Sequence, residues 1–140
     1  MTVLIGYLPT PEGDAAFGAA LDEAARRHEP VVVLNSPRDG ALVSTDLAAP
    51  DRIGGLTARA AAAAVDLDVR QAPHEGDFAD LLLSTAEEVD ASVIVIGLRR
   101  RSRVGKLILG SNAQRILLDA DRPVLAVKPP GPGIYRRTDE

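Results

Sequence analysis

The sequence predicts an α/β fold: one domain with an open, doubly wound, five-stranded parallel sheet and helices on both faces, in a Rossmann-like arrangement. Three observations predict it. Short apolar runs rich in β-branched residues are nearly continuous, as in strands buried on both faces. Segments with helical periodicity separate these runs, and such alternation implies right-handed crossovers. The length of 140 residues suits a single hydrophobic core.

Five strands are expected from these runs: Val3–Ile5, Val31–Leu34, Leu67–Arg70, Val93–Ile96 and Val124–Val127. Four of them are almost entirely apolar, which indicates burial in the middle of the sheet or under helices. The run Leu67–Arg70 instead alternates, with Leu67 and Val69 on one face. We therefore expect that strand near an edge of the sheet.

Four helices are expected between the strands, at Asp14–His28, Asp51–Val65, Asp77–Val89 and Ser111–Ala120. Three of them carry an apolar stripe at helical spacing, and the second is rich in alanine and free of proline. Asp77 is a candidate N-cap, and His28 is expected to interact with the last carbonyls of its helix. We expect residues 1–128 to form the domain, Pro37–Pro50 a linker, and residues 129–140 a flexible tail.

The composition excludes several classes of protein. The net charge of −4 gives no overall basic field, so we expect no nucleic-acid partner and no membrane partner. The absence of cysteine excludes disulfides, thiolate metal sites and a cysteine nucleophile. We expect no secretory leader, because the first residues show no basic start followed by a long apolar run, and no membrane span, because no apolar run approaches about 20 residues. A cytoplasmic protein is expected.

The most unusual segment follows the strand Val93–Ile96. It leaves the strand at Gly97, carries several basic residues, and returns through Gly110 and Ser111 into a helix. Amides at that helix start, with the positive end of its dipole behind them, would suit an anion such as phosphate. The candidate binding residues are Ile96, Gly97, Arg99, Arg100, Arg101, Arg103, Gly110, Ser111 and Asn112. The alternative is a solvated basic loop in which Ser111 only caps the helix.

Other chemical motifs are absent. Gly105-Lys106 suggests a P-loop, but that motif requires glycine at position 100 and Ser or Thr at position 107. No dinucleotide fingerprint and no Gly-x-Ser-x-Gly elbow is present. His74 stands beside Glu75 and Asp77, which suggests either a metal or base site or, more simply, a polar turn. Neither a catalytic nor a metal-binding residue is assigned.

These residues carry a family resemblance. The segments 75–83 and 86–97 resemble the third helix and fourth strand of universal stress proteins, and Arg122–Val127 resembles their final strand. The intervening loop, Gly97-x2-Arg100-x9-Gly110-Ser111, is similar to the family's nucleotide signature, Gly-x2-Gly-x9-Gly-Ser/Thr. The resemblance covers nearly the whole chain and is strongest from Gly76 to Val127.

The resemblance implies a sheet in the order 3-2-1-4-5 and a homodimer formed through the last strand, here Pro123 to Val127. It also implies a stress-response regulatory protein that binds an adenine nucleotide, ATP or AMP, with or without Mg²⁺. The phosphates would lie on the signature loop at the carboxyl ends of the strands. Enzymatic activity is not expected beyond weak ATP hydrolysis, because the signature loop contains no Asp or Glu.

The chain departs from the family pattern at two positions. Arg100 replaces the second glycine of the signature, and Leu8-Pro9-Thr10 replaces an Asp-Gly-Ser turn whose aspartate meets the adenine or ribose. These departures support an alternative, in which the protein is a dimeric member of the family that binds no nucleotide and acts through protein–protein interaction.

Overall fold

The computed structural model describes residues 1–36, 49–71, 76–100 and 107–129. Its main sheet has five strands in the order β3-β2-β1-β4-β7, and every neighbouring pair is parallel. The strands are β1 (Thr2–Gly6), β2 (Val31–Asn35), β3 (Leu67–Gln71), β4 (Ala91–Gly97) and β7 (Val124–Val127). The predicted sheet, including the order implied by the family resemblance, is therefore confirmed.

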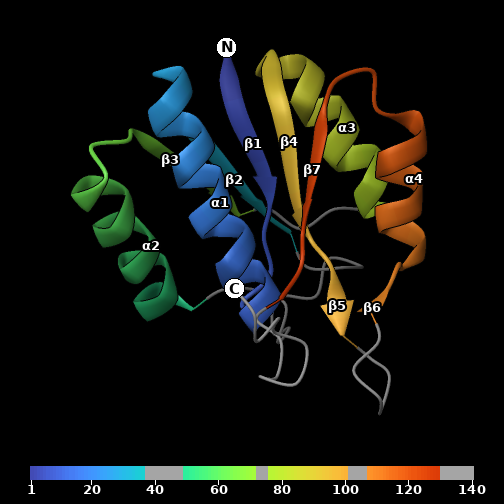
Figure 1. Ribbon diagram of the computed structural model, residues 1–140, viewed down its shortest axis with the longest axis horizontal. Coiled ribbons are helices and arrows are strands. Elements are labelled where there is room, and N and C mark those ends of the chain that lie inside the picture. The colour runs from blue at the N-terminus through green and yellow to red at the C-terminus, as the bar shows by residue number, and fades with distance from the viewer. Residues whose placement is uncertain (37–48, 72–75, 101–106, 130–140) are drawn as a thin grey trace, which may run out of the picture.

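Two helices cover each face of the sheet. The helices are α1 (Pro11–Arg27), α2 (Pro50–Ala62), α3 (Phe78–Glu88) and α4 (Ser111–Asp119). Figure 1 shows α1 and α2 on the near face, with α3 and α4 grouped behind and beside β4 and β7. The doubly wound arrangement predicted from the alternation of strands and helices is confirmed.

Two apolar layers hold the sheet between the helices. On the side of α1 and α2, alternate strand residues pack with Phe17, Leu21 and Leu56. On the side of α3 and α4, the other strand residues pack with Leu82 and Ile116. Each central strand is thus apolar on both faces, which explains why its sequence is continuous rather than alternating.

The two edges of the sheet differ in chemistry. The edge strand β3 places Leu67 and Val69 against the core, and the charged residues Asp68 and Arg70 alternate with them, as predicted. The other edge, β7, contains only apolar residues, and all four are partly exposed. Charges at one edge and their absence at the other make β7 the edge better suited to pair with another strand.

Several helix boundaries differ from the predicted ones. Helix α1 begins at Pro11, three residues before Asp14, because the Thr10 hydroxyl accepts a hydrogen bond from the Gly13 amide at 3.1 Å and Pro11 occupies the first turn. Helix α2 begins at Pro50, which the sequence placed in a linker. His28 ends α1 in the left-handed region and donates its backbone N–H to the Ala24 carbonyl. The predicted interaction of His28 with the last carbonyls of the helix is therefore made by its backbone N–H.

The structure confirms the predicted N-cap position at Asp77 and corrects the one at Ser111. Asp77 occupies the N-cap position of α3 but makes no capping hydrogen bond; its carboxylate instead accepts from Arg115. The N-cap of α4 is Gly110, so Ser111 is the first helical residue and does not cap the helix. Both side chains are thereby available for roles other than capping.

Two short strands were not predicted. β5 (Arg99–Arg100) and β6 (Leu107–Ile108) pair antiparallel, so the start and end of the signature loop form a small ladder. The predicted tail lies outside the described residues from 130 onward, as does most of the predicted linker, 37–48. Within the described part of the chain, every helix is too short or too polar to cross a bilayer.

Candidate functional site

A cleft of about 370 Å³ opens at the carboxyl ends of β1 and β4. These two strands are neighbours in the sheet, and the chain leaves them for opposite faces, so the cleft lies where the strand order reverses. Ligands bind at this position in open α/β sheets. Residues from both faces of the sheet line the cleft: Gly6, Leu8, Thr10, Glu12, Gly13, Ser36, Phe78, Ile96, Gly97, Leu98, Arg99, Gly110, Ser111, Asn112, Ala113 and Ile116.

Six of the nine predicted binding residues line this one cleft: Ile96, Gly97, Arg99, Gly110, Ser111 and Asn112. They come from two segments that β5 and β6 bring together, since Arg99 pairs with Ile108. Arg100 lies in β5, where its backbone pairs with Leu107. Arg101 and Arg103 lie outside the described residues.

The first turn of α4 forms one wall of the cleft. Gly110 has no side chain with which to cap the helix, and the first turn contains no acidic residue. In the other three helices that the structure describes, the first turn carries Asp or Glu. No acidic side chain in this turn therefore offsets the positive end of the α4 dipole, and Ser111, Asn112 and Ala113, whose amides have no partner within the helix, line the cleft.

Gly97 and Gly110 have different roles in the structure. A Cβ atom on Gly97 would lie 2.6 Å from the backbone oxygen of Glu12, so glycine is required there for β4 to approach α1. At Gly110, no atom of the described residues apart from its chain neighbours lies within 4 Å of the position of a Cβ atom, and its φ of −69° is open to any residue. The space beside Gly110 thus belongs to the cleft.

Glu12 is the residue of this site that sequence reasoning missed most clearly. It lies in the first turn of α1 and lines the cleft, opposite in charge to Arg99. Its carboxylate makes no hydrogen bond or ion pair with any described residue. The signature loop lacks an acid, but the fold supplies one from 85 positions earlier in the chain. The pair Thr10-Pro11, which is typical of a helix start, could have indicated that Glu12 lies in the first turn of this helix.

The rim on the other side of β1 is held by a polar ladder centred on the buried Asn35. The Asn35 side chain donates to the Tyr7 carbonyl oxygen at 2.9 Å and accepts from the Gln71 amide at 2.9 Å. These bonds tie the carboxyl ends of β1, β2 and β3 together. Ser36, which follows Asn35 and is also buried, then reaches the cleft.

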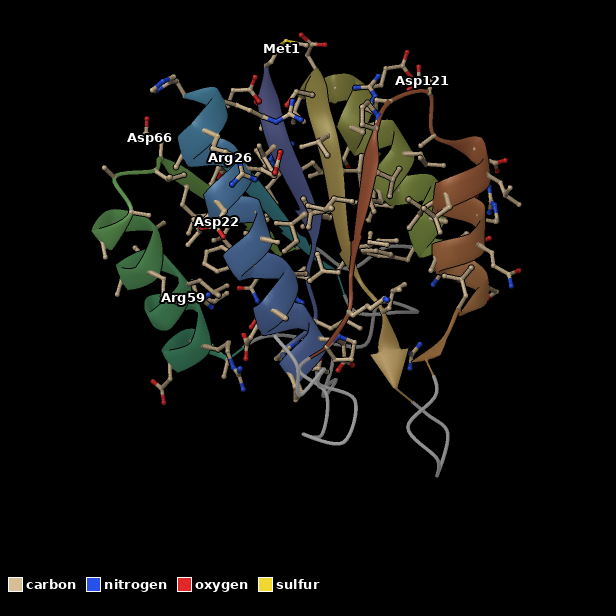
Figure 2. All side chains as sticks on the ribbon, viewed as in Figure 1. Met1, Asp22, Arg26, Arg59, Asp66 and Asp121 are labelled. Carbon is tan, nitrogen blue, oxygen red and sulfur yellow. The ribbon has the colours of Figure 1, made fainter. Side chains whose placement is uncertain are left out.

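Tyr7 links this rim to α1 and α2. Its hydroxyl donates to Asp14 Oδ1 at 2.8 Å, while Arg52 donates to Asp14 Oδ2 at 2.6 Å. Burial, followed by the hydrogen bond to Asp14, raises the pKa of Tyr7 to about 12. Farther along the same two helices, the Arg59 guanidinium lies 5.0 Å from the centre of the Phe17 ring. Figure 2 labels Arg59 between α2 and α1. Helices α1 and α2 are thus fixed to each other.

No metal centre is built from the part of the chain that the structure describes, where no three His, Asp or Glu side chains gather closely enough. His74, which the sequence offered as a metal or base candidate, lies outside that part. The described cleft therefore combines a helix start without a capping side chain, an arginine and one carboxylate.

Comparison with known proteins agrees with this architecture. The universal stress protein family matches residues 1–128. A universal stress protein of Mycolicibacterium smegmatis is 39% identical over 129 residues, which are 92% of this chain and 98% of that protein. The structure of a universal stress protein from Archaeoglobus fulgidus superposes with a TM-score of 0.77 at 27% identity, covering 91% of this chain and 98% of the other.

A structure of the universal stress protein from Archaeoglobus fulgidus in complex with dAMP has the same fold, with a TM-score of 0.73 at 23% identity over 91% of this chain and 98% of that one. The family match, the relative and the fold agree over the same span. The chain belongs to the universal stress protein family.

Proposed function

We propose that this protein is a stress-response regulatory domain that binds an adenine nucleotide, ATP or AMP, in the cleft between β1 and β4. The phosphates would lie on the first turn of α4, against the amides of Ser111 and Asn112, with Arg99 beside them. The base and ribose would extend toward Leu8 and Ser36. A cytoplasmic location and the absence of a nucleic-acid partner remain predictions from composition.

The observation that carries the proposal is the first turn of α4. This turn has neither a capping side chain nor an acidic residue, and it opens into a cleft at the point where the strand order reverses. Arg99 adds a positive charge on the same wall. The family relative solved with dAMP supports the choice of an adenine nucleotide.

Calorimetric titration of the purified protein with ATP and AMP, each with and without Mg²⁺, tests the proposal. We expect saturable binding that a Gly110→Arg variant abolishes, because the new side chain would enter the open space of the cleft. Gly54→Arg is the matched control: its position in α2 is equally open and does not line the cleft. An absence of heat at millimolar nucleotide would refute the proposal.

A second function is favoured by two observations. Leu8 stands where the family often has an aspartate, and the Glu12 carboxylate on the cleft repels phosphate. The protein would then be a dimeric module that acts through protein–protein interaction. Mass spectrometry of protein purified without added ligand separates the two functions, since a nucleotide that copurifies contradicts the second.

Both functions include a homodimer through the segment Pro123 to Val127. The apolar, partly exposed edge of β7 supports it, in contrast to the charged edge of β3. Light scattering at tens of micromolar protein should give the mass of a dimer. A monomer under those conditions would refute this part of the proposal.

We propose no catalytic role beyond weak ATP hydrolysis. Glu12 is the one carboxylate among the described residues that line the cleft, and no described base accompanies it. Any slow turnover should fall in the Ser111→Ala and Arg100→Ala variants. Turnover that both variants retain in full would point to a contaminating ATPase.

A further inference from the structure

Arg115 of α4 joins that helix to the start of α3. Its guanidinium donates to Asp77 Oδ2 at 2.5 Å and to the carboxylate of Asp80, and it lies 3.6 Å from Asp119 Oδ2. Hydrogen bonding to Asp80, aided by Asp77, raises the pKa of Arg115, so the guanidinium stays charged. We refer to Arg115, Asp77 and Asp80 as the clamp.

The clamp lies directly behind one wall of the cleft. Asp77 precedes Phe78, and Arg115 precedes Ile116; both of these apolar residues line the cleft. A displacement of α4 relative to α3 would therefore change the width of the cleft and move the amides of Ser111 and Asn112.

The apolar packing of α4 against the core is limited to Ile116 and the partly buried Ala113. Ile116 is its one buried residue, and the next two residues, Leu117 and Leu118, are exposed, the latter by 82%. A helix of nine residues with a single buried side chain depends on its remaining contacts for a fixed position. The clamp joins α4 to the N-terminal end of α3, next to the cleft.

We propose that Arg115 is a positioning residue, which holds the first turn of α4 where it can bind the phosphate of the ligand. This inference rests on the proposed nucleotide function. Arg115 does not line the cleft, so it acts through the placement of α4 and not by contact with the ligand.

A simpler electrostatic role makes the opposite prediction for one variant. If Arg115 only neutralised the two aspartates, then Asp77→Asn/Asp80→Asn would make the rim more positive and tighten phosphate binding. If the clamp positions α4, the same variant should weaken AMP binding, as Arg115→Gln should. We expect a loss of about threefold to tenfold in AMP affinity for both variants, and less than about twofold for adenosine, which lacks the phosphate.

Arg70→Gln is the matched control. Arg70 also pairs with two carboxylates, Asp68 of its own strand at 3.1 Å and Glu88 of α3 at 2.7 Å. Its side chain is 39% exposed, against 40% for Arg115, and it does not line the cleft. AMP affinity should be unchanged in this variant, so a general loss of ion pairs cannot produce the expected result.

Amide hydrogen exchange of the ligand-free protein tests the positioning separately. The Gln114 amide donates to the Gly110 carbonyl at 2.9 Å, and we expect it to exchange faster in both clamp variants than in the wild type or Arg70→Gln. Tighter AMP binding by Asp77→Asn/Asp80→Asn, or unchanged exchange at Gln114, would overturn the inference. Failure of the wild type to bind AMP would instead refute the proposed function.

Discussion

The glycine at the start of the signature loop offers a prediction that separates folding from ligand binding. In Gly97→Ala, the new methyl group would lie 2.6 Å from the Glu12 backbone oxygen and 3.0 Å from its carbonyl carbon. Both neighbours are backbone atoms, so no flexible side chain can move aside. The end of β4 and the first turn of α1 must separate by several tenths of an ångström.

The size of the effect follows from this overlap. Forcing an extra methyl into a closely packed site typically destabilises a protein by about 1–3 kcal/mol. For a chain of this length, such a loss lowers the melting temperature by roughly 3 to 10 °C. In Gly110→Ala the methyl group enters open space at an ordinary φ, so we expect a change within about 0.5 kcal/mol.

Thermal unfolding of the two variants beside the wild type, without ligand, measures the difference. Gly97→Ala should melt several degrees lower, and Gly110→Ala should match the wild type. Nucleotide affinity should fall in Gly110→Ala, because its methyl group narrows the proposed phosphate site. Equal melting temperatures for Gly97→Ala and the wild type would show that the approach of β4 to α1 is not as tight as described.

Three further predictions concern the frame around the cleft. The folded protein raises the pKa of Tyr7 from about 10 to about 12, so ionisation of the phenol should lower the free energy of unfolding progressively between pH 10 and pH 12. In Tyr7→Phe, which also loses the hydrogen bond to Asp14, unfolding curves at alkaline pH should show a smaller fall in this free energy across that window. Asn35→Ala leaves the Tyr7 carbonyl without its side-chain donor and should lower the free energy of unfolding by about 1–3 kcal/mol in urea, whereas the exposed Gln71→Ala should lower it less. Ala126→Lys adds a charge to the β7 edge and should shift light scattering toward the monomer; an unchanged dimer would place the interface elsewhere.

Much of the fold could be predicted from local sequence. The strands β1, β2, β4 and β7 are marked by continuous β-branched runs, and β3 by the alternation of Leu67 and Val69, because burial on two faces or one leaves these patterns. The pair β5 and β6 could not be predicted, since strands of two residues show no periodicity. The family resemblance, and not the periodicity, supplied the order of the strands.

The candidate site was predicted only where it is local in sequence. Gly110 and Ser111 mark a helix start without an acid, and this feature is readable from neighbouring residues. The approach of Glu12 to Gly97 and the pairing of Arg115 with Asp77 join residues that are distant in the chain. No spacing rule connects them until the topology places α1 beside β4, and α4 beside α3.

The central claim is that the first turn of α4 holds the phosphate of an adenine nucleotide. The most direct test is an AMP titration followed by the backbone amide resonances of the protein. The account predicts that the amides of Ser111, Asn112 and Ala113 shift most and saturate together, with much smaller shifts on adding adenosine. Saturable shifts confined to other elements, or none at millimolar AMP, would contradict it.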